Sequence, residues 1–331
     1  MWSLRVGEFA GSSAGVSTFA GLIAMLHVVL LAIAGALLVV IVGLWLLGER
    51  GWPMRESTWK GLRAGGLRGL LNFKGLHMYV YGRWTNQYLN IFINHVLPRL
   101  GPRGRKWWRD RYHAKVLTPE HANAIVTLDR QIPLRDLEQI IPYPKARDLV
   151  LSGPPDVAVY ECACRHARAN PCQPTQVCMV IGQPFVGFVV EHHPHSSRRL
   201  TQAEAVDLLQ AEHDRGHLHS AWFKDVCLGR FYAICNCCPC CCGGMEAVLK
   251  YDSPVLASSG YVARVDETEC SACGTCVDAC PFGALSLDDV AVLDWDKCYG
   301  CGVCTSRCPL QAIALVCDER KGLPLDVRLL G

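Results

Sequence analysis

The sequence predicts an α+β protein with a single transmembrane helix near its N-terminus and two cysteine-rich parts behind it. Three observations lead to this fold class. The run Phe19 to Gly48 is uncharged, all 20 cysteines lie between Cys162 and Cys317, and one cysteine pattern occurs twice near the C-terminus. A length of 331 residues suggests about two globular domains. We divide the chain into segments 1–18, 19–48, 49–117, 118–255 and 256–331.

The segment 19–48 is predicted to be an uncleaved membrane anchor. Its 30 residues contain no Lys, Arg, Asp or Glu, and about 20 apolar residues suffice to span a bilayer. A cleaved signal peptide would need a basic start and a small-residue cleavage site. The only charged residues of the tail 1–18 are Arg5 and Glu8, and no small-residue cleavage site follows the apolar run 19–48. His27 is interpreted as a tolerated polar residue, because two axial haem ligands would normally come from more than one helix.

The charges that follow the anchor predict its orientation. Residues 50–115 contain 14 Lys or Arg and two acidic residues, and basic residues beside a span stay on the cytoplasmic side. We therefore expect a single-pass protein of the cell membrane with the N-terminus outside and the C-terminal head in the cytoplasm. Adjacent cysteines such as Cys237 and Cys238 fit reduced thiols better than a disulfide framework, which agrees with this compartment.

The segment 49–117 is basic and rich in aromatic residues, including Tyr79, Tyr81 and Trp108. Aromatic and basic residues together are typical of the headgroup layer, so membrane lipid is the predicted partner. Docking onto another membrane subunit is the alternative. Nucleic acid is not expected as a partner, because the segment adjoins the anchor. A helix is predicted over residues 76–97, too polar to span the membrane.

Residues 118–255 predict a small α+β domain. Thr118 and Pro119 indicate a helix start, and Thr201-x-x-Glu204 is a capping box whose helix should end at Gly216. Short helices are expected over 134–141 and 146–152. Strands are expected over 157–160 and 185–190.

This domain has ten cysteines in two tight groups, which a hydrophobic core does not require. They are Cys162, Cys164, Cys172 and Cys178, then Cys235, Cys237, Cys238, Cys240, Cys241 and Cys242. Thiolates in this density predict a further metal centre, with one or two additional iron–sulfur clusters favoured over zinc. The first four are expected to combine with members of the later run. Cys227 and Cys317 are interpreted as core packing.

One short motif in the later run has a family parallel. Cys241-Cys242-Gly243 resembles the Cys-Cys-Gly motif of heterodisulfide-reductase-type cysteine-rich domains. Those domains carry a pair of such motifs, whereas this chain has one copy.

The segment 256–331 carries the duplicated pattern C-x2-C-x2-C-x3-C-P. The copies begin at Cys270 and Cys298, 28 positions apart. This is the spacing of cubane iron–sulfur ligands. Structural zinc is the alternative, but paired zinc knuckles need neither the third cysteine nor the Cys-Pro. Residues 260–317 resemble bacterial-type two-cluster [4Fe–4S] ferredoxins, including the stretch from Cys280 to Leu285.

The ferredoxin resemblance implies a pseudo-symmetric βαββαβ fold, two [4Fe–4S] clusters and low-potential one-electron chemistry. In that family the cysteine before proline ligates the cluster of the other copy. The implied ligands are Cys270, Cys273, Cys276 and Cys308 for cluster I, and Cys298, Cys301, Cys304 and Cys280 for cluster II.

The expected function is that of a membrane-anchored electron-transfer protein, more a carrier or complex subunit than a stand-alone enzyme. Residues 260–317 contain eight acidic and three basic residues, which favours a redox partner protein with a basic face. The alternative is a redox enzyme or reductase subunit with an active-site metal centre in residues 162–242. No nucleotide-binding glycine fingerprint supports that alternative.

Overall fold

A computed structural model describes residues 13–51, 53–66 and 73–330. The chain divides into two compact units, one ending at Arg55 and the other beginning at Glu56. Most of the predicted tail 1–18 lies outside the described residues.

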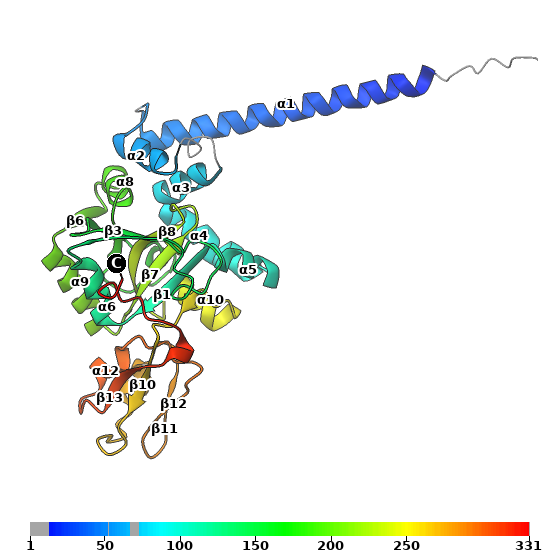
Figure 1. Cartoon of the computed structure of the whole chain (residues 1–331). Coiled ribbons are helices and arrows are strands. Elements are labelled where there is room, and N and C mark those ends of the chain that lie inside the picture. The colour runs from blue at the N-terminus through cyan, green and yellow to red at the C-terminus, as the bar shows by residue number, and fades with distance from the viewer. Residues whose placement is uncertain (1–12, 52, 67–72, 331) are drawn as a thin grey trace, which may run out of the picture. The chain divides into compact units, whose positions relative to one another are not determined.

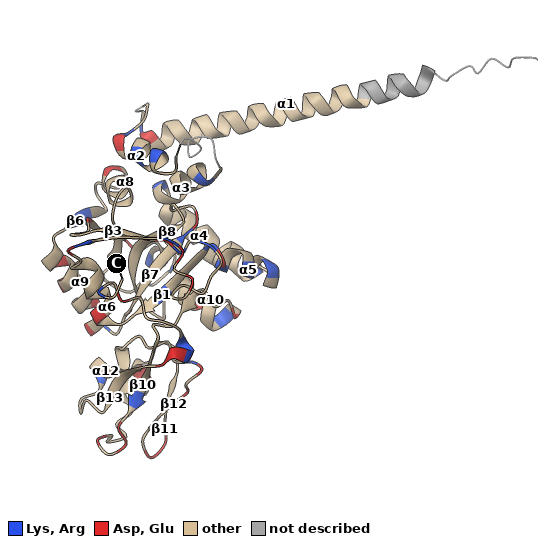
Figure 2. Cartoon of the chain, in the orientation of Figure 1, with Lys and Arg blue, Asp and Glu red and all other residues tan. Residues whose placement is uncertain are grey.

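The first unit is dominated by helix α1 (Ser13–Glu49). Among the described residues, Leu22–Glu49 is the one helix long and apolar enough to cross a membrane, with a mean hydropathy of 2.9 and no buried residue in its most apolar 18-residue stretch. At 1.5 Å per residue, 28 residues extend about 42 Å, which exceeds a hydrocarbon core of about 30 Å. Figure 2 shows no charged residue along the described part of α1 before its C-terminal end.

The second unit is built on a seven-stranded sheet in the order β6-β4-β5-β8-β7-β1-β9 (Figure 1). The pairs are antiparallel except for β1 with β9. In spatial order the strands are β6 (Ser197–Leu200), β4 (Val157–Glu161), β5 (Gln176–Ile181), β8 (Arg230–Cys237), β7 (Leu218–Lys224), β1 (Tyr112–Leu117) and β9 (Leu256–Ala257).

Both faces of this sheet are covered. Trp222 of β7 lies in one hydrophobic core, whereas its neighbours Ala221 and Phe223 lie in the other, because successive side chains point to opposite faces. One face is covered by α6 (Pro119–Val126) and α9 (Gln202–Asp214). The other is covered by α4 (Thr85–Ile91), α8 (Phe185–His192) and α10 (Gly243–Tyr251).

Shorter elements complete this part of the unit. They are α2 (Glu56–Ala64), α3 (Phe73–Arg83), the π-helix η1 (Phe92–Val96), the 3-10 turn η2 (Leu97–Arg99), α5 (Pro102–Arg109), β2 (Gln131–Leu134), β3 (Leu149–Ser152) and α7 (Ala163–His166).

The capping signals read from the sequence are confirmed. Thr118 Oγ1 accepts a hydrogen bond from His121 N–H at the start of α6. Thr201 and Glu204 form a complete capping box at the start of α9. That helix ends just before Gly216, which has a φ of +83°.

Three secondary-structure predictions are wrong, and a fourth is confirmed in part. The region 76–97 is helical but breaks at Trp84 between α3 and α4 and continues as the π-helix η1. Leu134 ends strand β2, residues 135–141 form loop and turns, and residues 149–152 form strand β3, which pairs with β2. Residues 185–190 belong to helix α8 and not to a strand.

The predicted segment 49–117 contributes to the core of the second unit. Its last strand, β1, pairs with β7 over its whole length. Tyr79, Tyr81 and Trp108 are buried, and Tyr112 stacks on Trp222 with ring centroids 4.6 Å apart. Burial removes Tyr79, Tyr81 and Trp108 from contact with lipid, whereas Phe73 and Trp107 of the same segment are exposed.

The C-terminal part runs β10 (Tyr261–Val265), α11 (Thr275–Ala279), β11 (Leu285–Leu287), β12 (Ala291–Leu293), α12 (Val303–Arg307), β13 (Ile313–Cys317) and the 3-10 turn η3 (Glu319–Lys321). Antiparallel pairs join β10 to β13 and β11 to β12. Phe282 stacks on Tyr299 at 4.3 Å, and both contact the core that holds Trp222. The chain then returns to the large sheet, where Leu325 is fully buried.

Candidate metal centres

The first cavity of the C-terminal part is lined by four cysteines, Cys270, Cys273, Cys276 and Cys308. Three come from the loop before α11 and the first turn of that helix. The fourth comes from the other copy of the pattern. Gly274 starts α11 with a φ of +77°, a conformation that glycine adopts without strain.

The second cavity is the counterpart of the first and is lined by Cys280, Cys298, Cys301 and Cys304. Its loop requires a glycine at position 300. Gly300 has a φ of +63°, and a Cβ added there would lie 2.1 Å from the carbonyl oxygen of Tyr261.

The cysteines before proline occupy equivalent settings in the two copies. Ala284 N–H donates a hydrogen bond to Cys280 Sγ at 3.2 Å, and Ala312 N–H donates to Cys308 Sγ at 3.2 Å. Backbone donors of this kind stabilise a sulfur that carries negative charge. The two copies therefore hold this sulfur in the same way.

The electrostatics of the second cavity fit a cationic occupant. Burial, followed by the negative charge of neighbouring thiolates, raises the pKa of Cys304 to about 12. Burial also raises the pKa of Cys301. A bound metal centre would compensate the negative charge of thiolates gathered in this cavity, so the donor set fits a thiolate-bound centre.

Residues 269–312 match the family model of a 4Fe-4S dicluster domain. This confirms the predicted ferredoxin-type domain at the C-terminus. Among proteins with curated descriptions and among solved structures, none matches the chain. The dicluster domain covers a small part of the chain, and the geometry of the remaining cysteines must be read from the structure itself.

The ten upstream cysteines come from two segments that the sheet brings together. One segment runs from the end of β4 through α7 to β5, and the other runs from β8 to the start of α10. Because β5 pairs with β8, cysteines far apart in sequence become neighbours. They divide into a group of six around a cavity and a compact group of four.

The group of six lines a cavity beside the large sheet. We call it the six-cysteine cavity, and its thiols are Cys162, Cys164, Cys178, Cys235, Cys237 and Cys242. Cys242 Sγ lies 3.2 Å from Cys237 Sγ. The hydrogen bond with Cys164, outweighing that with Cys178, raises the pKa of Cys162 to about 12. Cys238 and Cys241, which belong to the group of four, also line this cavity.

Aromatic side chains also line the six-cysteine cavity, and no local sequence pattern predicted this. They are Tyr81, Phe92, Trp108, Tyr112, Tyr160, Trp222 and Tyr232. Tyr81 and Tyr232 share a hydrogen bond of 2.8 Å between their hydroxyl groups. Burial raises the pKa of both hydroxyls well above the usual range, so they stay uncharged.

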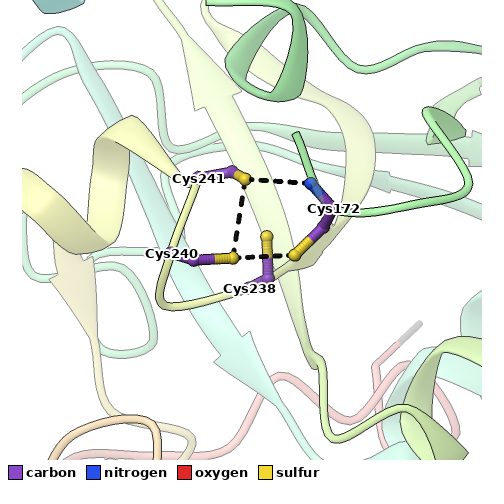
Figure 3. Close-up of side chains that lie close together, drawn as sticks. All are labelled: Cys172, Cys238, Cys240 and Cys241. Atoms are coloured by element: carbon purple, nitrogen blue, oxygen red, sulfur yellow. Dashed lines mark hydrogen bonds between the residues drawn. The ribbon is translucent and has the colours of Figure 1, made fainter. Parts of the chain in front are cut away.

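The group of four consists of Cys172, Cys238, Cys240 and Cys241 (Figure 3). Their sulfurs all lie within 4.8 Å of one another. The sequence prediction placed Cys172 with Cys162, Cys164 and Cys178, and the structure separates it from them. Its partners are the three cysteines of the turn between β8 and α10.

A buried ion network lies behind these thiols. Arg165 Nη2 donates to Glu212 Oε2 at 2.8 Å, and the side chains are 1% and 0% exposed. His217 Nδ1 lies 2.7 Å from the same carboxylate oxygen. Burial alone would raise the pKa of Glu212, but the bonds from His217 and Arg165 outweigh it and lower that pKa. The sequence did not predict a role for Glu212, because an acidic residue in a helix with many polar residues gives no local signal that it is buried.

The two cysteines interpreted as core packing differ. Cys227 is buried, as expected, and burial raises its pKa to about 12. Cys317 is exposed at the end of β13, so that prediction is wrong.

Near Cys227, Lys224 Nζ lies over the rings of Tyr81 and Tyr112 at 4.4 and 4.2 Å. Burial lowers the pKa of Lys224 to about 8.

Proposed function

We propose that the protein transfers single electrons through two [4Fe–4S] clusters in its C-terminal domain. The observation that carries this proposal is that each cavity of the dicluster domain is lined by three cysteines of one copy and the Cys-Pro cysteine of the other. Cys270, Cys273, Cys276 and Cys308 would hold cluster I. Cys298, Cys301, Cys304 and Cys280 would hold cluster II.

The arrangement supports transfer between the two centres. Helices α11 and α12 pack against each other, and each begins beside one of the cavities. When bound, each cubane would accept and release one electron at a time. The chain's contribution is to hold eight thiolates and exclude water, since Cys276, Cys298, Cys301 and Cys304 are buried.

We further propose that the six-cysteine cavity holds an additional iron–sulfur centre. Six thiols around one space exceed what core packing requires, and thiolates favour iron–sulfur clusters and zinc. A continuous hydrophobic core contains Cys237 and Cys242 of this cavity together with Phe282 and Cys301 of the dicluster domain. This continuity supports a path for electrons between the upstream centre and cluster II.

The anchor and the charge distribution suggest where the protein works. The apolar helix and the basic residues that follow it support a single-pass membrane protein with its head on the cytoplasmic side. Membrane lipid and either a redox partner protein or subunits of a membrane complex would be its partners. The net negative charge of residues 260–317 favours a basic docking face on that partner.

A second candidate function is that of a redox enzyme with its active site in the six-cysteine cavity. The observation that favours it is the aromatic lining, which gives this cavity the mainly apolar, enclosed character of a ligand site. An iron–sulfur centre with one iron free of cysteine would leave a position for substrate. A centre fully ligated by thiolates would leave none.

The deciding experiment is the content of iron and acid-labile sulfide in the full chain, purified in detergent without oxygen. Two cubanes require about eight of each per chain. A value of about eight supports the dicluster proposal and overturns the upstream centre. A value of about twelve or more supports both, and a value well below eight overturns the proposal of two clusters.

A further inference from the structure

The four sulfurs of Cys172, Cys238, Cys240 and Cys241 lie close enough together to bind a single metal ion once those of Cys172 and Cys240 move apart by about 1 Å. With metal–sulfur bonds of about 2.3 Å, tetrahedral geometry puts ligand sulfurs about 3.8 Å apart. Cys240 Sγ lies 3.5 Å from Cys241 Sγ and 2.7 Å from Cys172 Sγ. All four sulfurs lie within 4.8 Å of one another. In a cubane each thiolate binds a different iron, so its ligand sulfurs stand farther apart.

The cysteines of the dicluster domain provide an internal comparison. They line cavities in sets of four, yet within the described ranges they do not form a group with all sulfurs inside 4.8 Å. Among the described residues, the six thiols around the six-cysteine cavity likewise form no group with all sulfurs inside 4.8 Å. The close group of four is therefore a different kind of site in the same chain.

The surroundings of the group suit a charged tetrathiolate. One divalent ion with four thiolates carries a net charge of about −2. Arg168 Nε donates to the carbonyl oxygen of Cys241 at 3.1 Å, which places its guanidinium beside the group. Arg165 Nη2 lies 3.4 Å from the carbonyl oxygen of Asn236, two residues before Cys238. Both guanidinium groups also pair with carboxylates, Arg165 with Glu212 and Arg168 with Glu246, so they offset only part of the charge of a tetrathiolate.

A backbone contact gives an independent observation. Cys172 N–H donates to Cys241 Sγ at 3.4 Å (Figure 3). Hydrogen bonds of this kind favour the thiolate over the thiol. The donor and acceptor come from loops 69 residues apart in the sequence. This contact joins the two loops that carry the four cysteines.

We propose that Cys172, Cys238, Cys240 and Cys241 bind one mononuclear divalent metal ion, with zinc as the expected occupant. Four cysteines with no open position make a closed, structural type of site. The ion would tie the loop between α7 and β5 to the turn between β8 and α10. These segments carry the thiols of the six-cysteine cavity, so the ion would keep that cavity assembled. The proposal does not depend on electron transfer by the dicluster domain.

The test is the loss of metal relative to sulfide in cysteine variants of the full chain, purified in detergent without oxygen. Cys172→Ala and Cys240→Ala should each lose about one metal ion per chain while the sulfide content stays at the wild-type value. Cys240 is exposed, so its variant should fold even if Cys172→Ala does not. Cys317→Ala is the matched control, because that exposed cysteine belongs to neither group, and it should lose nothing.

The ratio of the losses decides the outcome. Loss of one zinc or iron without sulfide supports the mononuclear site. Loss of iron and sulfide in equal amounts would show that these cysteines ligate a cluster and would overturn the proposal. An unchanged metal content, or a disulfide between Cys172 and Cys240 in the purified wild type, would overturn it as well. As a spectroscopic check, Co²⁺ bound in place of the native ion should give tetrahedral thiolate absorption that Cys240→Ala lacks.

Discussion

Paired alanine substitutions at Cys276, Cys280 and Cys308 test which cysteines share a cluster. Cys276 and Cys308 line one cavity, whereas Cys280 lines the other. Each single variant should therefore damage one cluster, about four of eight dicluster irons. The double variant Cys276→Ala/Cys308→Ala should lose no more than either single variant. The double variant Cys276→Ala/Cys280→Ala should lose about eight irons, because it damages both clusters.

The assay is iron and sulfide content together with electron paramagnetic resonance of the reduced protein, which reports how many clusters are altered even if a damaged cluster retains some iron. If Cys276 and Cys308 bind the same cluster, their iron losses are not additive. If Cys276 and Cys280 bind different clusters, their iron losses add. The reverse pattern would mean that each run of four cysteines holds its own cluster. That outcome would refute the ligand exchange between the copies. Cys317→Ala serves as the control and should retain all iron.

Three further outcomes are expected. Gly300→Ala should lower the free energy of unfolding by roughly 3 kcal/mol or more, because its Cβ would meet the Tyr261 carbonyl 2.1 Å away. The matched variant Gly283→Ala, with a similar φ but open space, should cost about 1–2 kcal/mol in chemical unfolding; equal losses would contradict the steric argument. Burial lowers the pKa of His113 from 6.5 to about 4. Its neutral form stabilises the fold above pH 6.5, and about 3 kcal/mol should be lost as the pH falls toward 4. Urea unfolding of His113→Gln should show a weaker pH dependence, and an unchanged dependence would argue against this source. Deleting residues 1–55 should move the protein from the membrane to the soluble fraction; retention at high salt would reveal a second anchor.

Local signals predicted helix starts well and short apolar runs poorly. The capping box at Thr201 identified α9, because both partners are fixed by a spacing of three residues. The run 185–190 was expected to be a strand, yet it forms α8 with Val186 and Val189 buried. Its apolar residues fit the periodicity of a helix and that of a strand, and the helix forms because it packs on the sheet.

Pairing between distant segments was not predictable. Strand β3 forms because Leu149–Ser152 meets β2, and strand β1 forms because it meets β7. The burial of aromatic residues before β1 was unpredictable for the same reason. Nothing local indicated that Tyr81 and Trp108 would be covered by residues more than a hundred positions away.

The sequence by itself determined the chemistry of the dicluster domain and the apolar character of the anchor. A cysteine every third residue before Cys-Pro fixes the ligand type through covalent spacing, which no tertiary contact can alter. Only the tertiary structure decided how the other ten cysteines divide. Cys172 joins Cys240 across 68 residues because β5 and β8 are neighbours in the sheet, and sheet pairing is a long-range interaction that residue spacing does not record.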